Sequence, residues 1–165
     1  MNRKNVHPSL LPSLLDRLTD NEPNIVGEPP ATRSQSLREL KNNLRRDLEW
    51  LLNSRRNPTA IPEGARQLTR SVFAYGLPDI SGMSLSSERD RTALLNVIED
   101  AVIAFEPRLA NVTVTLVPTE THARTLRFQI EGMLRMEPAP ERVSFDTTLQ
   151  LASATYEVEA ERRAG

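Results

Sequence analysis

The spacing of apolar residues changes along this chain from a helical period to a strand period, and this change limits the folds that it can adopt. Apolar residues recur every three or four positions in 37–51 and again in 94–105, as on one face of a helix. From residue 111 onward, apolar and polar residues alternate one by one in 111–116, 126–136 and 143–151. Such alternation is typical of strands with one buried face. Helical segments followed by strand segments predict an α+β fold.

Local signals place the ends of these elements. The first long helix should run from Ser36 to about Arg55, where Asn57 and Pro58 follow. The second should begin after a helix-capping serine, Ser87, and end at Glu106 because Pro107 disfavours helical geometry there. The segment "ATYEVEA" adds a short last strand. We therefore expect two long amphipathic helices on one face of a roughly four-stranded, mostly antiparallel sheet.

The segment between the two helices reads as a connector. "RQLTRSVFAYGLPD" predicts a short helix that closes at Gly76, a residue suited to the left-handed conformation that ends helices. We expect this connector to contribute Leu68, Val72 and Phe73 to the core.

The N-terminal region is predicted to be a separate extension. A stripe of leucines on a short helix comprises Leu10, Leu11, Leu14, Leu15 and Leu18. Residues 19–35 follow it, are rich in Pro, Asn and Gly, and read as a linker. The expected organisation is a docking helix and linker over 1–35 and the main domain over 36–165. A short helix on a tether has to dock to be stable, either on its own domain or on a partner, and both alternatives stay open.

Charge and composition exclude several classes of function. The chain has 165 residues, 21 basic and 22 acidic residues and a formal net charge of -1, so it lacks the positive field expected of a nucleic-acid-binding protein. It contains no cysteine. No apolar run approaches the roughly 20 residues that a membrane span needs, and the N-terminus does not read as a signal peptide. These features predict a cytoplasmic protein without direct membrane insertion.

The residue pattern offers no catalytic, cofactor or metal site. His7 and His122 are far apart and show no metal-ligand spacing. A glycosidase needs a protonated carboxylic acid and a second carboxylate. Glu106 is the candidate acid, with Glu99 or Asp100 as its partner, but the neighbouring Arg108 would hold Glu106 ionised, which is the wrong state for a general acid. We therefore expect no enzymatic activity.

The corner "FEPRL" has a structural explanation in two versions. If the backbone is extended, Glu106 and Arg108 project to the same side, and Pro107 makes them a stiff pair of charged prongs. The first version is a surface ion pair of little energetic weight, and the second is a socket for complementary charges on another protein. Trp50 is expected to face away from the apolar stripe, where it packs under a loop of its own domain or contacts a partner.

Taken together, these segments resemble a known family. The order "SLLDRL", "LRRDLEWLLNSRR", "YGLPD", "FEPRL", "LRFQIEGMLRMEP" and "FDTTLQLASATYEV" resembles the TssE family of type VI secretion baseplate proteins, relatives of the lysozyme-like baseplate wedge proteins of contractile-tailed phages. The Glu-Pro-Arg hallmark of that family corresponds to Glu106, Pro107 and Arg108. The family commonly has a small residue at the position of Trp50, so any role of Trp50 would be particular to this chain.

The resemblance implies a function and a set of partners. The protein would be a structural part of the baseplate wedge, together with TssF, TssG and TssK, in a cytoplasmic baseplate docked at the inner membrane. It would also help to initiate the TssB/TssC sheath, and we expect a sheet edge near Thr148, Thr155 and Tyr156 to accept a strand for this purpose. The alternatives are a peptidoglycan hydrolase, which the chemistry disfavours, and a free-standing peptide-binding module that works by strand addition.

Overall fold

The computed structural model describes residues 18, 33–84, 86–118 and 125–160. The chain divides into two compact units, 1–44 and 45–165. Of the predicted N-terminal helix, only Leu18 is among the described residues, and its side chain is exposed. Leu10, Leu11, Leu14 and Leu15 lie outside the described residues, so the docking helix and the domain boundary after residue 35 stay predictions.

Helix α2, Arg33–Asn53, begins earlier than predicted and passes from the first unit into the second. In the first unit, Leu37 and Leu40 are only half-buried, whereas Leu44 is fully buried. In the second unit the predicted stripe is buried at Leu48 and Leu51. The apolar face is therefore buried along the C-terminal part of α2 rather than along its whole length.

Helix α3, Glu88–Phe105, has the ends that the sequence predicted. The Ser87 hydroxyl accepts a hydrogen bond from the backbone N–H of Asp90, which satisfies one of the free donors of the first turn. Glu106 follows as the C-cap, so the helix stops one residue before Pro107. Its buried face consists of Leu94, Ile98, Ala101 and Val102.

The connector between the helices differs from the prediction. It contains two short 3-10 helices, η1 (Arg66–Arg70) and η2 (Val72–Ala74), in place of one α-helix. Val72 is 91% exposed, so the expectation that it joins the core was wrong. The break at Ser71, whose backbone is extended, changes the direction of the chain and turns Val72 outward while Ala74 becomes buried.

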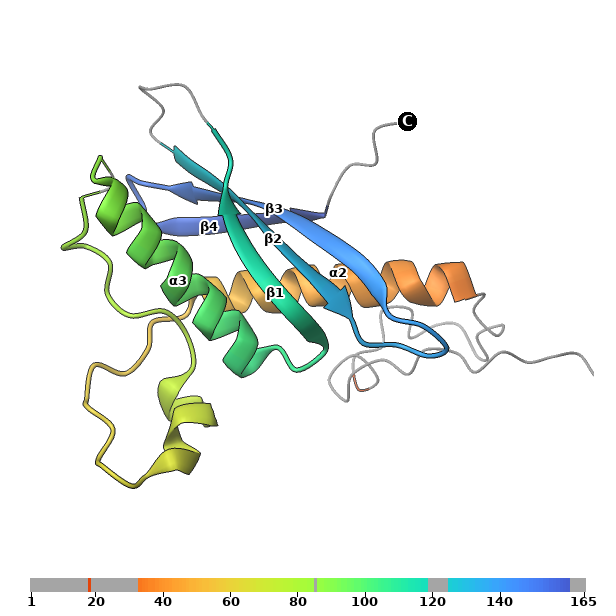
Figure 1. Cartoon of the computed structure of the whole chain (residues 1–165), viewed down its shortest axis with the longest axis horizontal. Coiled ribbons are helices and arrows are strands. Elements are labelled where there is room, and N and C mark those ends of the chain that lie inside the picture. Colours follow the sequence, from red (N-terminus) through yellow and green to blue (C-terminus); the bar gives the residue numbers. More distant parts are fainter. Residues whose placement is uncertain (1–17, 19–32, 85, 119–124, 161–165) are drawn as a thin grey trace, which may run out of the picture. The chain divides into compact units, whose positions relative to one another are not determined.

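Four antiparallel strands form one sheet in the order β1-β2-β3-β4 (Figure 1). Their bounds are Leu109–Leu116, Thr125–Leu134, Glu141–Gln150 and Thr155–Ala160. The α+β class and the antiparallel four-stranded sheet are thus confirmed, and α3 lies alongside β1. Among the described residues, no helix is both long and apolar enough to cross a membrane.

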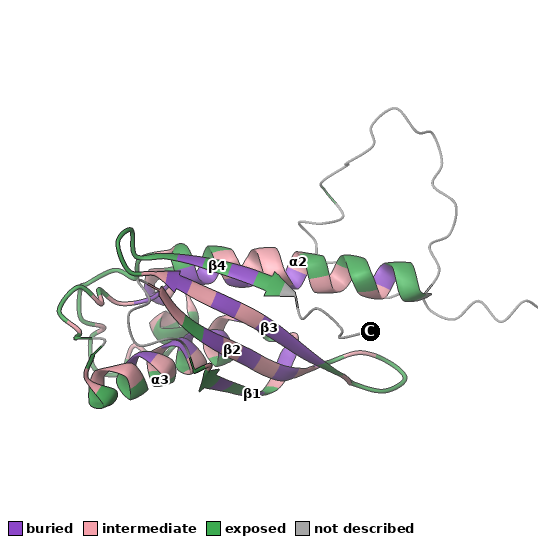
Figure 2. Ribbon diagram, turned by 90° about the horizontal axis from the view of Figure 1, so that it is seen from above, coloured by how far each residue is buried: buried purple, intermediate pink, exposed green. Residues whose placement is uncertain are grey.

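The register places most of the apolar side chains of the four strands on one face. Ile130 is opposite Val114 on one side and opposite Phe145 on the other, and Tyr156 is opposite Leu149. These five side chains are buried, and Figure 2 shows buried residues alternating with more exposed ones along the central strands. The other face carries mainly polar side chains, which matches the alternation in the sequence.

A close backbone approach holds the connector against the end of α2. The backbone N–H of Leu77 donates to the carbonyl of Ser54, and that of Arg56 donates to the carbonyl of Leu77, both at 2.8 Å. Gly76 precedes this contact with φ of +97°, and a Cβ placed there would lie 2.3 Å from the carbonyl oxygen of Ser54. Gly76 is thus required both by its conformation and by the space available.

Replacing Gly76 by alanine should therefore destabilise the fold strongly. Gly64 is the matched control, because its φ is +88° but nothing lies within 4 Å of the added Cβ. We expect Gly64→Ala to lower the free energy of unfolding by about 1 kcal/mol through backbone strain alone. Gly76→Ala should lower it by more than about 3 kcal/mol, because overlap adds to strain. Urea denaturation measures both values, and equal losses would contradict the close approach.

Candidate functional site

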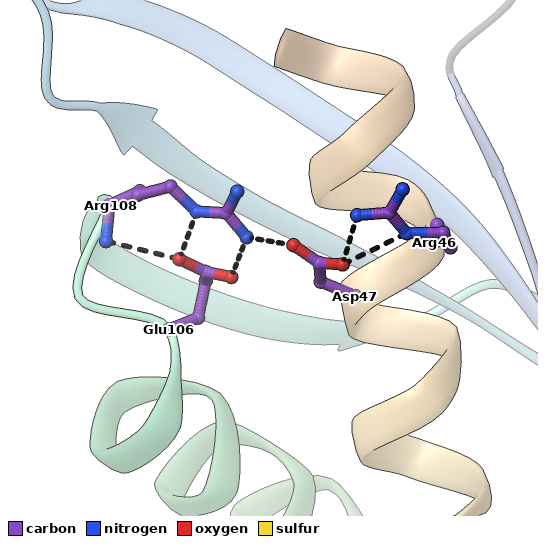
Figure 3. A network of polar contacts seen from close by, with 4 residues as sticks. All are labelled: Arg46, Asp47, Glu106 and Arg108. Carbon is purple, nitrogen blue, oxygen red and sulfur yellow. Dashed lines mark hydrogen bonds and ion pairs between the residues drawn. The ribbon is translucent and has the colours of Figure 1, made fainter. Parts of the chain in front are cut away.

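The Glu-Pro-Arg corner is the centre of a chain of ion pairs that we call the corner network: Glu106, Arg108, Asp47 and Arg46 (Figure 3). Arg108 binds Glu106 with both Nε, at 2.6 Å from Oε1, and Nη2. The same Nη2 donates to Oδ2 of Asp47 at 2.6 Å. Arg46 donates from Nε and Nη2 to Oδ1 of Asp47, at 3.1 and 2.9 Å. Two arginines and two carboxylates thus alternate in one connected group.

Three elements bring these residues together. Glu106 caps α3, and its backbone N–H still donates to the carbonyl of Val102. Arg108 lies just before β1, where its carbonyl accepts from the backbone N–H of Arg135. Asp47 and Arg46 project from α2 (Figure 3). The corner network therefore links the α3–β1 turn to α2, two segments that are far apart in the sequence.

Burial increases the strength of these pairs. Glu106 is 5% exposed, and its backbone turn adds a further bond, since the N–H of Arg108 donates to Oε1 at 3.1 Å. The hydrogen bond to Glu106 is the largest cause that raises the pKa of Arg108, and it outweighs the opposing effect of burial. A charged group in this position is stabilised by its partners rather than by water.

Tyr75 borders the corner network. Burial, followed by the negative charges of Asp47 and Glu106, raises the pKa of its hydroxyl. Its ring packs edge-on against Phe105, with the ring centroids 5.3 Å apart. Tyr75 therefore lies close enough to the corner network to be affected by the charges of both carboxylates.

The structure corrects the picture of two free prongs. Glu106 and Arg108 do not project side by side into solvent, because they bind each other and Arg108 also binds Asp47. Only Pro107 of the motif is classed as exposed. The expectation failed because the residue before the proline is a helix cap rather than an extended residue, so its side chain turns back toward Arg108.

Trp50 faces outward, as predicted. It is 52% exposed, and the guanidinium carbon of Arg46 lies 5.0 Å from the centroid of its ring. This geometry is that of a cation–π interaction. Arg46 joins Trp50 to Asp47, so the exposed tryptophan continues the corner network at the surface.

Sequence reasoning missed Asp47, although the sequence contained a signal for it. Asp47 lies three residues after Leu44 and four before Leu51, which puts an acidic residue within the apolar stripe of α2. A carboxylate in such a position needs a cation, and the sequence does not say which arginine supplies it. The structure assigns that role to Arg108, 61 residues away.

The carboxylates near the corner are engaged in structural contacts. Both oxygens of Glu106 accept hydrogen bonds from Arg108, and Glu99 accepts one from the backbone N–H of Val114 at 3.0 Å. Within the described part of the chain, no group of three acidic or histidine side chains could hold a metal ion. His7 falls outside the described residues, and so does His122.

The residues predicted at the sheet edge have different positions. Thr148 lies on β3 between β2 and β4, paired with Arg127 and Glu157, so its assignment to an edge was wrong. Thr155 begins β4, which is an edge strand, and is exposed. Tyr156 is only 3% exposed, and its side chain belongs to the core. The predicted last strand is β4, and it pairs with β3 along Thr148, so β3 has no free edge there.

Removing Arg108 should cost far more than breaking a surface pair. The matched control is Arg142, which is 73% exposed and bonded to Glu131 at 2.8 Å. We expect Arg108→Ala to lower the free energy of unfolding by about 3 kcal/mol, since Glu106 is left buried without its cation. Arg142→Ala should change it by less than about 0.5 kcal/mol. Urea denaturation compares them, and a similar small effect of both would show that the corner network is solvated.

The Tyr156 hydroxyl should make stability depend on alkaline pH. Burial raises its pKa from 10.0 to about 12, and the hydroxyl has no hydrogen-bond partner among the described residues. The folded state favours the neutral hydroxyl. Its contribution to the free energy of unfolding is therefore complete below pH 10.0 and is lost as the pH rises toward about 12. Tyr156→Phe should leave the stability unchanged or slightly higher near about pH 8. At higher pH the variant should lose less stability than the parent. Thermal unfolding across this range tests it, and identical pH profiles would contradict the effect.

Comparison with known proteins identifies the family. Residues 38–139 match the family described as baseplate wedge protein gp25. Comparisons with curated proteins and with solved structures gave no match. The matched region includes α3, β1, β2 and all four residues of the corner network, and it spans more than half of the chain. The chain therefore belongs to the baseplate wedge protein gp25 family.

Proposed function

We propose that this chain is a structural component of a type VI secretion baseplate wedge. In this proposal it links the wedge proteins TssF, TssG and TssK and helps to initiate the TssB/TssC sheath, within a cytoplasmic baseplate docked at the inner membrane. The observation that carries the proposal is the family match over residues 38–139, which contains the whole Glu-Pro-Arg corner.

The corner network supports a structural role rather than hydrolysis. A glycosidase acid has to hold a proton and donate it to a sugar oxygen. Glu106 is 5% exposed, and both of its oxygens accept bonds from Arg108. A buried carboxylate whose two oxygens are both bound by one arginine is not accessible to a bulky substrate. In the proposal, the protein is therefore structural and is not an enzyme.

The same network suggests how the corner serves assembly. Arg108 binds carboxylates from two segments, so it fixes the α3–β1 turn against α2. Pro107 is exposed at this turn, and Trp50 is exposed on α2 beside Arg46. Large aromatic and arginine side chains are the residue types that contribute most to interfaces. In the proposal, the corner network sets the shape of a surface that wedge proteins recognise.

Two further partner surfaces remain part of the proposal. The leucine stripe with Leu11, Leu14, Leu15 and Leu18 is predicted to dock on its own domain or on a wedge protein. The β4 edge, beginning at Thr155, is predicted to accept a strand from the sheath, since edge strands present unpaired backbone groups.

Co-purification from cells that carry a type VI secretion system tests the proposal. The tagged parent chain should recover TssF, TssG and TssK. We expect Glu106→Gln to reduce this recovery about tenfold or more, because Arg108 loses the charge that holds it in the corner. A loss of about 1.4 kcal/mol of binding free energy is enough for a tenfold effect. Circular dichroism at the assay temperature verifies that the variant is folded.

The matched control is Glu131→Gln, which breaks the exposed pair with Arg142 and should assemble normally. Failure of the parent chain to recover wedge proteins would overturn the structural role. Normal recovery of wedge proteins with folded Glu106→Gln would show that the corner does not contribute to the interface. Cell-wall hydrolysis by the parent that is lost in Glu106→Gln would favour an enzyme instead.

A further inference from the structure

The outer edge of β4 is bound by the side chain of Asn53. The side-chain N–H of Asn53 donates to the carbonyl oxygen of Tyr156 at 2.8 Å, and its carbonyl oxygen accepts from the backbone N–H of Tyr156 at 2.9 Å. A primary amide that binds both polar groups of one residue reproduces the pair of bonds that a neighbouring strand would make. Asn53 therefore takes the place of a strand residue beside β4.

A second side chain of α2 continues this contact. Arg45 donates from Nη1 to the carbonyl oxygen of Val158 at 3.1 Å and to Glu49 at 3.0 Å. Asn53 lies eight residues after Arg45, two turns along the same face of the helix. Tyr156 and Val158 are two residues apart on β4, so their outward backbone groups point the same way. We call Asn53 and Arg45 the edge guard.

The edge guard blocks unspecific pairing at the β4 edge. An unprotected edge strand exposes donors and acceptors that pair with any extended chain. The edge guard satisfies both backbone groups of Tyr156 and the carbonyl of Val158 without providing a strand. A strand that adds to β4 has to replace these same bonds.

We propose that the edge guard keeps the β4 edge closed in the free protein and has to withdraw before an extended segment of another protein adds there. The inference rests on the strand addition included in the proposed function and adds its regulation. The exchange is balanced in hydrogen bonds, because the incoming backbone replaces the amide of Asn53 and the guanidinium of Arg45. Only a strand whose backbone groups match these positions can therefore replace the bonds of the edge guard without a net loss of hydrogen bonds.

The charges beside the edge define the segment that fits. Glu157 and Glu159 are exposed on the polar face of β4, and Glu159 is directly opposite Asp146 on β3. Within the described part of the chain, neither Glu157 nor Glu159 forms an ion pair. Like charges opposite each other destabilise a sheet, and a cation next to them relieves this repulsion. The edge therefore fits an extended segment with basic residues at alternate positions.

The same charges act against pairing between two copies of this chain. If β4 paired antiparallel with β4 of a second copy, the glutamates of both strands would lie on one face near each other. Repulsion would then add to the cost of displacing both guards. The incoming segment is therefore expected to come from another protein with a basic strand.

Hydrogen exchange of the purified chain tests the guard without any partner. In Asn53→Ala, the amide of Tyr156 loses its acceptor and faces solvent, so it should exchange at least about tenfold faster than in the parent. The amide of Glu157, which faces β3, should keep its protection. Asn96→Ala removes an exposed asparagine of α3 and is the matched control. Unchanged exchange of the Tyr156 amide in Asn53→Ala would overturn the guard.

A binding experiment tests the consequence. Two synthetic peptides have apolar residues at every second position, with lysine at the alternate positions of one and glutamate at those of the other. The lysine peptide should bind Asn53→Ala about tenfold or more tightly than it binds the parent, and the glutamate peptide should bind neither. Asn53→Asp keeps the acceptor and loses the donor, so it should be intermediate.

Fluorescence anisotropy measures these affinities. Equal binding of the lysine peptide to parent and Asn53→Ala, or tighter binding of the glutamate peptide, would contradict the inference. These measurements use the isolated protein, so they succeed or fail independently of co-purification with wedge proteins. A failed co-purification with a confirmed guard would overturn the proposed function alone.

Discussion

The two-sided engagement of Arg108 is the interaction on which the arrangement of the corner depends. Its guanidinium binds Glu106 at the end of α3 and Asp47 on α2, so a single side chain joins the α3–β1 turn to a distant helix. An arginine suits this position because its planar group binds one carboxylate with two donors and keeps a further one for a second. A lysine would offer a point charge without this fixed geometry.

The proline between the two charged residues contributes through the backbone. Pro107 follows the helix cap, so α3 ends at Phe105 and the chain turns directly into β1. This tight turn brings the Glu106 carboxylate to the N–H and the guanidinium of Arg108. The three residues of the motif therefore work as one unit: a cap, a rigid turn and a charge that binds both the cap and α2. That unit explains the motif without a catalytic role.

The helices also complete the sheet at its edges. Glu99 of α3 accepts a bond from the outward N–H of Val114 on β1, and Asn53 of α2 does the same for Tyr156 on β4. Each edge strand thus receives a polar side chain from a helix in at least one position. This arrangement limits unspecific pairing in a protein for which we propose controlled strand addition. The polar residues of the helices therefore have as definite a function as the apolar ones.

Local patterns were sufficient to predict the α+β class, the bounds of α3 and the alternation along β2 and β3. The reason is that periodicity, the Ser87 cap and the proline at 107 act over a few residues. The same patterns failed for Val72, where a break at Ser71 changed the direction of the connector, and for Thr148, which was assigned to an edge although it lies between two paired strands. Both errors concern the position of one segment relative to another.

The sequence by itself determined that two long helical segments precede the alternating strands, and that Glu106, Pro107 and Arg108 form a corner. Only the tertiary structure decided that Arg108 binds Asp47, 61 residues away, and that Asn53 binds Tyr156, 103 residues away. Hydrogen bonds and ion pairs of this kind act over about 3 Å in space and leave no periodic trace in the sequence. Their partners are known only when packing of the apolar faces has brought the two segments together.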